Sequence, residues 1–556
     1  MYVMPVGVDN FRELVEKGYY FVDKTNFIKE LLDNKNKVTL INRPRRFGKT
    51  LNMRMLQEFF DVNSDSGDLF AGLRISQAGE TYMQYQGKYP VIFLQMKTAA
   101  AGDFEKTFAI LKAIIAKLYR KYAFLEESQA LTADEKEYYV RVRHGREHCT
   151  YDDLILSLGA LTDMLYKHYG TKPIILIDEY DAPIQHAWEN GFYDELIQFM
   201  RQFYSEALKG NDALEFAVLT GVLRVAKESI FSGLNNLRVC SVLSQNYNEF
   251  FGFTGAEVAK MAADLGCEDK LPELKEWYDG YNFCGADIYN PWSVLQYFQE
   301  GCVADAYWVN TSSNGIIKYM LGRLDDRGRG ELQSLMAGNK VRKNLQDSVI
   351  YDEIGNNADD LYTMLLTTGY LKCTNIQSGA LGKTLDLQIP NLEIMQLFTR
   401  EIAQNLTGYG GVSDVINMME EMLNGNQRLF EADLNRILRN CVSYHDASNG
   451  ESFYHGMMLG FCVLLKNTHI AESNRESGYG RFDLALLPID RRNYGVILEF
   501  KRVSEEAQLE AKAKEALAQI EELSYIAEFE KRQVKKVWKY GIAFCGKKVC
   551  LRGNIV

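Results

Sequence analysis

Residues 37–60 constrain this chain more than any other stretch, because they join a strand pattern to a helix pattern through a basic loop. Residues 37–41 are apolar and β-branched, which predicts a buried strand. Residues 51–60 carry apolar side chains at helical spacing and contain no helix breaker. The loop between them ends in Gly-Lys-Thr at positions 48–50. This tripeptide between a strand and a helix predicts a phosphate-binding loop.

Such a loop binds phosphate through its geometry. Backbone N–H groups at the start of a helix point at the anion, and the helix dipole favours its negative charge. We expect Lys49 to reach the β- and γ-phosphates of ATP and the Thr50 hydroxyl to hold Mg²⁺. The predicted cofactor-binding residues of the loop are Arg43, Pro44, Arg45, Arg46, Phe47, Gly48, Lys49, Thr50 and Leu51.

The loop departs from the usual pattern at its first position. That pattern is a glycine, four residues of any type and then Gly-Lys-Thr, whereas this chain has Arg43 in place of the first glycine. Pro44 fixes φ and stiffens the turn, and Arg45 and Arg46 add positive charge beside the phosphates. The alternative interpretation is an exposed basic loop that leads into an ordinary helix.

A second motif supports the first. Residues 172–177 form a nearly continuous apolar run, typical of a central parallel strand, and two acids, Asp178 and Glu179, follow directly. In nucleotide-binding α/β folds this end of a strand lies at the ligand edge of the sheet. We therefore predict that Asp178 binds Mg²⁺ and that Glu179 polarises the attacking water. The alternative is a strand followed by an acidic turn.

Further segments predict the rest of a parallel α/β sheet, because strand patterns alternate with helix patterns at 104–122 and 151–169. Thr220 ends one of these strands and is a candidate sensor of the γ-phosphate. Arg224 follows as a candidate phosphate contact, with a surface cation as the alternative. The additional strand patterns lie at residues 89–96, 215–221 and 238–243.

Composition limits the class of protein. At 556 residues, the usual ~100–200 residues per domain predicts about three or four domains. A hydrophobic content of 47% with 9 Pro favours a folded chain, and a net charge of -11 argues against a protein that coats nucleic acid over its whole surface. The 10 Cys are scattered without zinc spacing. The sequence has neither a secretion signal nor a membrane-spanning run, so we expect a cytoplasmic protein without membrane contact. The sequence does not decide whether the protein forms a homo-oligomer.

The motifs resemble the bacterial AAA-ATPase-like family. The segments that carry this resemblance are PVGVDNF at 5–11, NRPRRFGKT at 42–50, LIDEYD at 176–181, TGVLR at 220–224, FSGLNNL at 231–237 and FGFT at 251–254. The resemblance covers residues 1 to about 300 and implies a P-loop ATPase domain, in which an arginine at the first glycine position is typical. It also implies a PD-(D/E)XK nuclease domain at the C-terminus, which members of the family commonly carry.

The C-terminal stretch holds a second candidate site. Residues 481–487 and 494–501 predict two strands joined by a turn, and Glu499 and Lys501 share one strand face because side chains alternate. Asp483 on the first strand can lie opposite them. Two carboxylates can hold Mg²⁺ through hard oxygen ligands, and the lysine can orient water or stabilise the transition state. The alternative is a β-hairpin with a cross-strand salt bridge.

This pattern resembles the PD-(D/E)XK nuclease core. The resemblance implies that Asp483 and Glu499 are metal ligands and that Lys501 is the catalytic lysine. It further implies that Glu451 is the acid found before the first core strand and that Gln519 is a later polar site residue. The proline that usually precedes the aspartate is replaced by Phe482.

Together these observations predict three regions in an α/β protein. We expect a P-loop NTPase domain with a parallel sheet at 1–255, a helical lid or linker at 256–440 and an α/β restriction-endonuclease-like domain at 441–556. The predicted function is an ATP-binding and ATP-hydrolysing protein coupled to a Mg²⁺-dependent nuclease, with DNA favoured over RNA. The alternative is a signalling or scaffold ATPase whose C-terminal domain binds nucleic acid without cutting it. A basic rim is expected around the hairpin, formed by Arg475, Arg481, Arg491, Arg492, Lys501 and Arg502.

Overall fold

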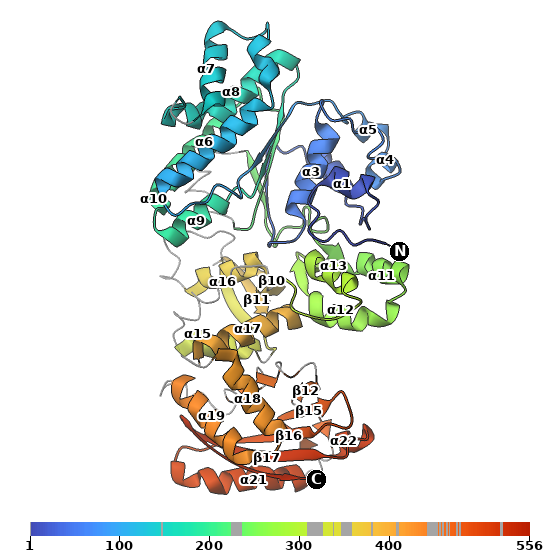
Figure 1. Cartoon of the computed structure of the whole chain (residues 1–556), viewed down its shortest axis with the longest axis vertical. Coiled ribbons are helices and arrows are strands. Elements are labelled where there is room, and N and C mark those ends of the chain that lie inside the picture. The colour runs from blue at the N-terminus through green and yellow to red at the C-terminus, as the bar shows by residue number, and fades with distance from the viewer. Residues whose placement is uncertain are drawn as a thin grey trace. The chain divides into compact units, whose positions relative to one another are not determined.

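The structure is a computed structural model that describes residues 2–556 except 146–147, 224–235, 309–325, 337, 346–357, 380–381, 407–410, 442–453, 455–456, 459–460, 463–464, 466–467, 474–475, 478–479 and 523–525. The chain divides into two compact units (Figure 1). The first consists of Met1–Trp308 and Lys343–Leu385, and the second of Val309–Arg342 and Asp386–Val556. Each unit therefore includes part of the middle region, and the predicted boundaries at 255 and 440 stay predictions.

The first unit is built on a five-stranded parallel sheet with strand order β2-β3-β4-β1-β5. Its strands are β1 (Val38–Asn42), β2 (Val91–Gln95), β3 (Ile174–Asp178), β4 (Ala217–Gly221) and β5 (Leu237–Cys240). Every residue of β1, β3 and β4 is buried, as expected of a parallel sheet covered on both faces. The predicted parallel α/β sheet is confirmed.

Helices follow the strands of this sheet, and Figure 1 shows α6, α8 and α10 side by side. The α8 helix begins where predicted because Thr150 and Asp153 form a reciprocal capping box. The helices of the unit are α1 (Phe11–Glu16), α2 (Asn26–Asn34), α3 (Lys49–Phe60), α4 (Arg74–Gln77), α5 (Glu80–Met83), α6 (Phe104–Arg120), α7 (Ala133–His144), α8 (Tyr151–Tyr169), α9 (Ala182–Asn190), α10 (Tyr193–Leu208), α11 (Gly255–Leu265), α12 (Leu271–Tyr278), α13 (Pro291–Gln299) and α16 (Ala358–Thr368).

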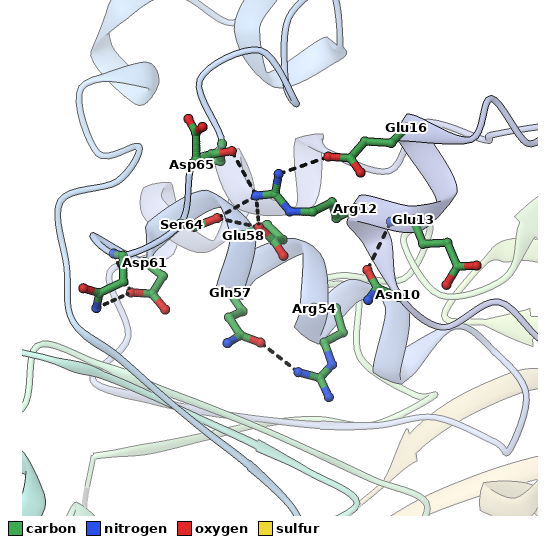
Figure 2. A network of polar contacts seen from close by, with 12 residues as sticks. Asn10, Arg12, Glu13, Glu16, Arg54, Gln57, Glu58, Asp61, Ser64 and Asp65 are labelled. Carbon is green, nitrogen blue, oxygen red and sulfur yellow. Dashed lines mark hydrogen bonds and ion pairs between the residues drawn. The ribbon is translucent and has the colours of Figure 1, made fainter. Parts of the chain in front are cut away.

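A polar network fixes the C-terminal half of α3, the helix that follows the predicted phosphate loop (Figure 2). The Arg12 guanidinium on α1 donates to the Glu58 carboxylate at 2.7 Å, to the Ser64 hydroxyl at 3.0 Å and to the Asp65 carbonyl at 3.0 Å. It also pairs with Glu16 on its own helix. Because one guanidinium holds α1, α3 and the following turn together, the C-terminal end of α3 is fixed against its neighbours.

The middle region contains strands as well as helices. A small sheet in the first unit has the order β6-β8-β7, and another has the order β10-β11-β9. The expectation of a helical lid or linker at 256–440 did not include the second sheet, since the sequence of β10 is polar and has no continuous apolar face. These strands are β6 (Phe253–Thr254), β7 (Tyr281–Phe283), β8 (Ala286–Tyr289), β9 (Val341–Leu345), β10 (Lys372–Gly379) and β11 (Gly382–Gln388).

The second unit is a mixed five-stranded sheet with strand order β12-β15-β16-β17-β18, in which only the β16–β17 pair is parallel. Its strands are β12 (His469–Ser473), β15 (Leu484–Pro488), β16 (Gly495–Arg502), β17 (Val537–Cys545) and β18 (Lys548–Ile555), beside the short pair β13 (Glu476–Ser477) and β14 (Gly480–Arg481). Its helices are α15 (Asp326–Met336), α17 (Leu392–Leu406), α18 (Gly411–Leu423), α19 (Gln427–Cys441), α21 (Leu509–Glu522) and α22 (Ala527–Lys531).

Two apolar cores cover the two faces of this sheet. Leu484, Leu486 and Leu498 belong to the core that includes residues of α18 and α19. Ala485 and Ile497 belong to the core that includes residues of α21 and α22. This alternation is the period of two expected for strands buried on both faces. Among the helices that the structure describes, none has the length and apolarity needed to cross a bilayer.

Candidate active sites

The predicted phosphate loop lies between β1 and the first turn of α3. Gly48 and Arg46 both have left-handed backbones, with φ of 79° and 68°. Alternation of right- and left-handed residues turns successive N–H groups toward one point and makes an anion-binding concavity. The Lys49 ammonium is buried and donates to the carbonyls of Arg43 at 3.0 Å and Pro44 at 2.8 Å. Burial lowers the pKa of Lys49, while the acids that follow β3 act against this shift.

Asp178, at the end of β3, contacts residues of α3 and of the neighbouring strands β2 and β4. Its carboxylate is fully buried and accepts hydrogen bonds of 2.7 Å from the Thr50 hydroxyl and 2.7 Å from the Thr220 hydroxyl. Gln95, at the end of β2 and in register with Asp178, approaches the same carboxylate at 3.4 Å. The structure thus brings Thr50, Asp178 and Thr220 together as the sequence suggested. Gln95 was missed, although its position as a polar residue ending a strand was the available signal.

Hydroxyl and carboxylate oxygens are hard ligands suited to Mg²⁺, so the donor set of Thr50 and Asp178 fits a magnesium nucleotide. The next acid, Glu179, is half-buried and has a left-handed backbone with φ of 55°. A non-glycine residue rarely adopts this conformation outside functional sites and tight turns. Asp181, in contrast, accepts the backbone N–H groups of Val222 and Leu223 at 2.9 and 2.7 Å. Asp181 is therefore committed to the turn after β4.

The side chain of Arg43, one of the predicted cofactor-binding residues, points into the protein. Its guanidinium is completely buried and donates to the carbonyls of Asn42, Cys240 and Tyr247 at 2.8, 2.9 and 3.1 Å. It also lies over the ring of Phe283, 5.2 Å from the ring centre. Burial lowers the pKa of Arg43 to about 10. The side chain is thus turned into the protein, and only the backbone of Arg43 faces the predicted cofactor site.

The remaining loop residues divide into exposed and buried side chains. Arg45 is exposed and donates to Gln185 on α9 at 3.2 Å. Arg46 is exposed and lies over the ring of Trp292 at 4.1 Å. Pro44 and Phe47 are buried and Leu51 is half-buried, so their side chains support the loop. Arg224 lies outside the described residues.

The second candidate site is at the open end of the β15–β16 hairpin. Asp483 directly precedes β15, and its carboxylate accepts the Phe500 N–H at 2.7 Å. Glu499 is 2% exposed, and the Lys501 ammonium lies 3.5 Å from its carboxylate on the same strand face. Gln519 on α21 donates to that same Glu499 oxygen. The structure therefore gathers Asp483, Glu499, Lys501 and Gln519, as the sequence predicted.

The other oxygen of Glu499, Oε2, is buried and has no hydrogen-bond partner among the described residues. Burial first, and then the nearby Asp483 carboxylate, raises the pKa of Glu499 to about 7. An orphaned carboxylate oxygen beside a second carboxylate fits a hard divalent cation, which would supply the missing partner. In the described part of the chain no three His, Cys, Asp or Glu side chains gather as one metal-binding group. Glu451, the third predicted ligand here, lies outside the described residues.

Gly541 explains how α21 comes close enough for Gln519 to reach Glu499. It lies on β17 in register with Glu499. A Cβ at this position would stand 2.2 Å from the Leu517 N and 2.3 Å from the Ala513 carbonyl oxygen, both on α21. Only a residue without a side chain permits this approach of helix to sheet.

The predicted basic rim is wrong for the two arginines of the turn. Arg491 and Arg492 follow β15, whereas Asp483 precedes it, so they lie at opposite ends of this strand. At about 3.3 Å per residue, the four steps from Gly495 to Glu499 already span about 13 Å. Arg492 is also paired with Asp490. Arg475 and the side chain of Arg481 lie outside the described part of the chain, so the rim retains Lys501 and Arg502.

Comparison with known proteins finds a family match for each of the two regions that hold these sites. Residues 5–231 match the family model described as predicted AAA-ATPase, and residues 449–553 match that of the PD-(D/E)XK nuclease superfamily. This chain combines an AAA-ATPase-like domain with a PD-(D/E)XK nuclease superfamily domain. The AAA-ATPase-like domain contains the Lys49 loop and Asp178, and the nuclease-superfamily domain contains Asp483, Glu499 and Lys501.

A protein from Azotobacter chroococcum mcd 1 is similar over nearly the whole length. It is described as "Uncharacterized protein in vnfD 5'region" and is 27% identical over 549 residues, which cover 95% of this chain and 94% of that protein. The similarity therefore extends through the middle region that neither family model covers.

Proposed function

We propose that this protein binds and hydrolyses ATP in its AAA-ATPase-like domain and cleaves nucleic acid phosphodiesters in its nuclease-superfamily domain. The observation that carries the proposal is that each domain has a buried, hydrogen-bonded carboxylate at the position its family motif predicts. These are Asp178, held by Thr50 and Thr220, and Glu499, held by Gln519. Buried carboxylates are costly unless they serve a bound cation or a paired group.

In the AAA-ATPase-like domain, Lys49 and the N–H groups at the start of α3 would bind the β- and γ-phosphates. Thr50 and Asp178 would hold Mg²⁺, which neutralises charge on the phosphate oxygens when it is bound. Glu179 would accept a proton from the attacking water as general base. Thr220 would orient Asp178 and face the γ-phosphate.

In the nuclease-superfamily domain, Asp483 and Glu499 would hold Mg²⁺ against the scissile phosphate. A bound divalent cation polarises the phosphoryl oxygens and lowers the pKa of its water. Lys501 lies beside Glu499 and would stabilise the negative charge that develops on the phosphate. Gln519 would fix the rotamer of Glu499. DNA remains the favoured substrate over RNA, and a basic surface at Lys501 and Arg502 would contact its backbone.

The second candidate function is an ATPase whose C-terminal domain binds nucleic acid without cutting it. It is favoured if Glu499 stays protonated at neutral pH, since burial and Asp483 raise its pKa to about 7.

The deciding experiment incubates the full-length protein with single- and double-stranded DNA and RNA, with Mg²⁺ or EDTA and with or without ATP. Cleavage that needs Mg²⁺ and is lost in Glu499→Ala supports the nuclease. Binding without cleavage in every condition supports the binding function instead. A cleavage rate that changes with ATP would show that the two activities are coupled.

A further inference from the structure

Four successive residues of the phosphate loop contact one downstream region of the same unit. A Cβ built on Gly369 would lie 3.0 Å from the Cβ of Pro44. The indole N–H of Trp308 donates to the Arg45 carbonyl at 3.1 Å. The side chain of Arg46 lies 4.1 Å from the centre of the Trp292 ring.

The fourth contact is made by Phe47, whose ring meets Tyr281 at 4.9 Å and Phe283 at 5.6 Å between ring centres. We call the contacting residues the loop brace; they are Tyr281, Phe283, Trp292, Trp308 and Gly369. The brace is itself well fixed. Trp308 is 1% exposed and packs on Tyr370, with 5.2 Å between ring centres.

The brace contacts side chains of the loop and one backbone carbonyl. None of these contacts uses an N–H group of the loop, so the brace does not compete with phosphate for those donors. One brace contact also opposes a cost in the loop. Arg46 has a left-handed backbone with φ of 68°, which is unfavourable for any residue with a Cβ. Stacking of the guanidinium on Trp292 is attractive and favours the backbone that permits it.

We infer that Trp292 and Trp308 are positioning residues for nucleotide binding, which hold residues 44–47 in the conformation that accepts the phosphates of ATP. The inference rests on the proposed ATP binding and adds to it. A loop that visits other conformations binds with an affinity reduced by the fraction of time it is competent. The brace raises that fraction before the nucleotide arrives.

In this inference the Arg46 side chain does not contact phosphate directly. It maintains the left-handed backbone of the loop by stacking on Trp292. If the stack on Trp292 serves to maintain the left-handed backbone, glycine should replace arginine better than alanine does, since glycine adopts positive φ without cost. If the Arg46 side chain instead binds phosphate directly and the stack is not needed, Trp292→Leu should leave the affinity unchanged.

The test measures the Kd of full-length protein for ATP with Mg²⁺, and for a non-hydrolysable analogue, by calorimetry. We expect Arg46→Ala and Trp292→Leu to weaken binding by about threefold to fivefold, and Arg46→Gly to bind more tightly than Arg46→Ala. Trp308→Phe keeps an aromatic ring but removes the indole N–H together with the five-membered ring, and we expect about a fivefold loss. Trp538→Phe is the matched control, because its indole N–H lies in the other unit and has no partner among the described residues.

Two results would overturn the inference. An unchanged Kd in Trp292→Leu would assign the effect of Arg46 to a direct phosphate contact, and an unchanged Kd in Trp308→Phe would show that the brace does not hold the loop. Wild-type protein that binds no ATP would instead overturn the proposed function and, with it, the inference. Melting temperatures of all variants are recorded, so that a loss of folded protein is distinguished from a loss of affinity.

Discussion

The Thr50 hydroxyl on the first turn of α3 donates a 2.7 Å hydrogen bond to the Asp178 carboxylate at the end of β3. These residues are 128 positions apart, and the parallel sheet brings them to one edge. The same carboxylate receives Thr220 from β4. Both hydroxyls therefore point at one buried acid, and protein contacts alone hold Thr50, Asp178 and Thr220 together.

Lys49→Ala should weaken ATP binding by about tenfold to a hundredfold, because charge-assisted hydrogen bonds to phosphate are lost. The ammonium already sits beside the loop carbonyls, so it needs only a small movement to reach a nucleotide. Calorimetry with ATP and Mg²⁺ measures the effect. Lys29→Ala, which removes an exposed cation on α2, is the control. An unchanged affinity in Lys49→Ala would remove the loop from the ATP site.

Glu179→Gln should keep ATP binding and slow hydrolysis by about a hundredfold or more, because the amide retains the shape but cannot accept the proton. Steady-state phosphate release measures the rate, and calorimetry measures the affinity. The comparison variant is Asp181→Asn, whose carboxylate holds the turn after β4. We expect that variant to lower stability as well as activity. Normal turnover in Glu179→Gln would show that another group activates the water.

The sequence predicted Asp178 and Glu179 because a motif fixes their spacing from the strand that carries them. It also predicted Glu499 beside Lys501, since a period of two is a property of every strand. The role of Arg43 could not be predicted in this way. Its partners are carbonyl groups of Cys240 and Tyr247, about two hundred residues away, and a carbonyl leaves no signature in residue type.

The basic rim failed for a related reason. Arg491 and Arg492 are close to Asp483 in sequence, yet a hairpin separates its turn from its open end by the full length of both strands. Gln95 shows the converse, because a single polar residue at the end of a strand is too common a pattern to single out. Residues that are close in sequence are close in the fold only where the element between them is short. For longer elements, the strand register must be known before their distance can be predicted.

His469 should make the β12–β15 pair sensitive to acid. Its ring is buried, with a nitrogen 2.8 Å from the Tyr494 carbonyl, and burial lowers its pKa below the ordinary 6.5. Because the unfolded state then binds more protons, stability is full above about pH 6.5 and falls as the pH drops toward the folded pKa. Protection factors of the Ile470 and Leu487 amides, which correct for the intrinsic exchange rate at each pH, should fall over this interval. His469→Gln should flatten that response, whereas His186→Gln in the other unit should leave it in place.

Gly541→Ala should destabilise the nuclease-superfamily domain by about 3 kcal/mol or more, because overpacking against rigid backbone cannot be relieved by side-chain movement. The added methyl group would meet the α21 backbone at 2.2 Å. Thermal unfolding measures the loss, and Gly330→Ala on α15 is the control, since a Cβ there meets nothing within 4 Å. If α21 moves away to relieve the clash, Gln519 should lose Glu499 and cleavage should fall even where the domain stays folded.

Asp483→Ala and Glu499→Ala should each abolish Mg²⁺-dependent cleavage and leave ATP affinity intact, because the two sites belong to different domains. EDTA should stop the wild-type reaction and added Mg²⁺ should restore it. Glu522→Ala, at the end of α21, is the matched control for loss of an acid from the same domain. Cleavage that survives both substitutions in protein free of contaminating nuclease would exclude this site. Lys49→Ala then tests coupling: a changed cleavage rate in that variant means that nucleotide binding controls the nuclease, and an equal rate means that one chain carries two independent activities.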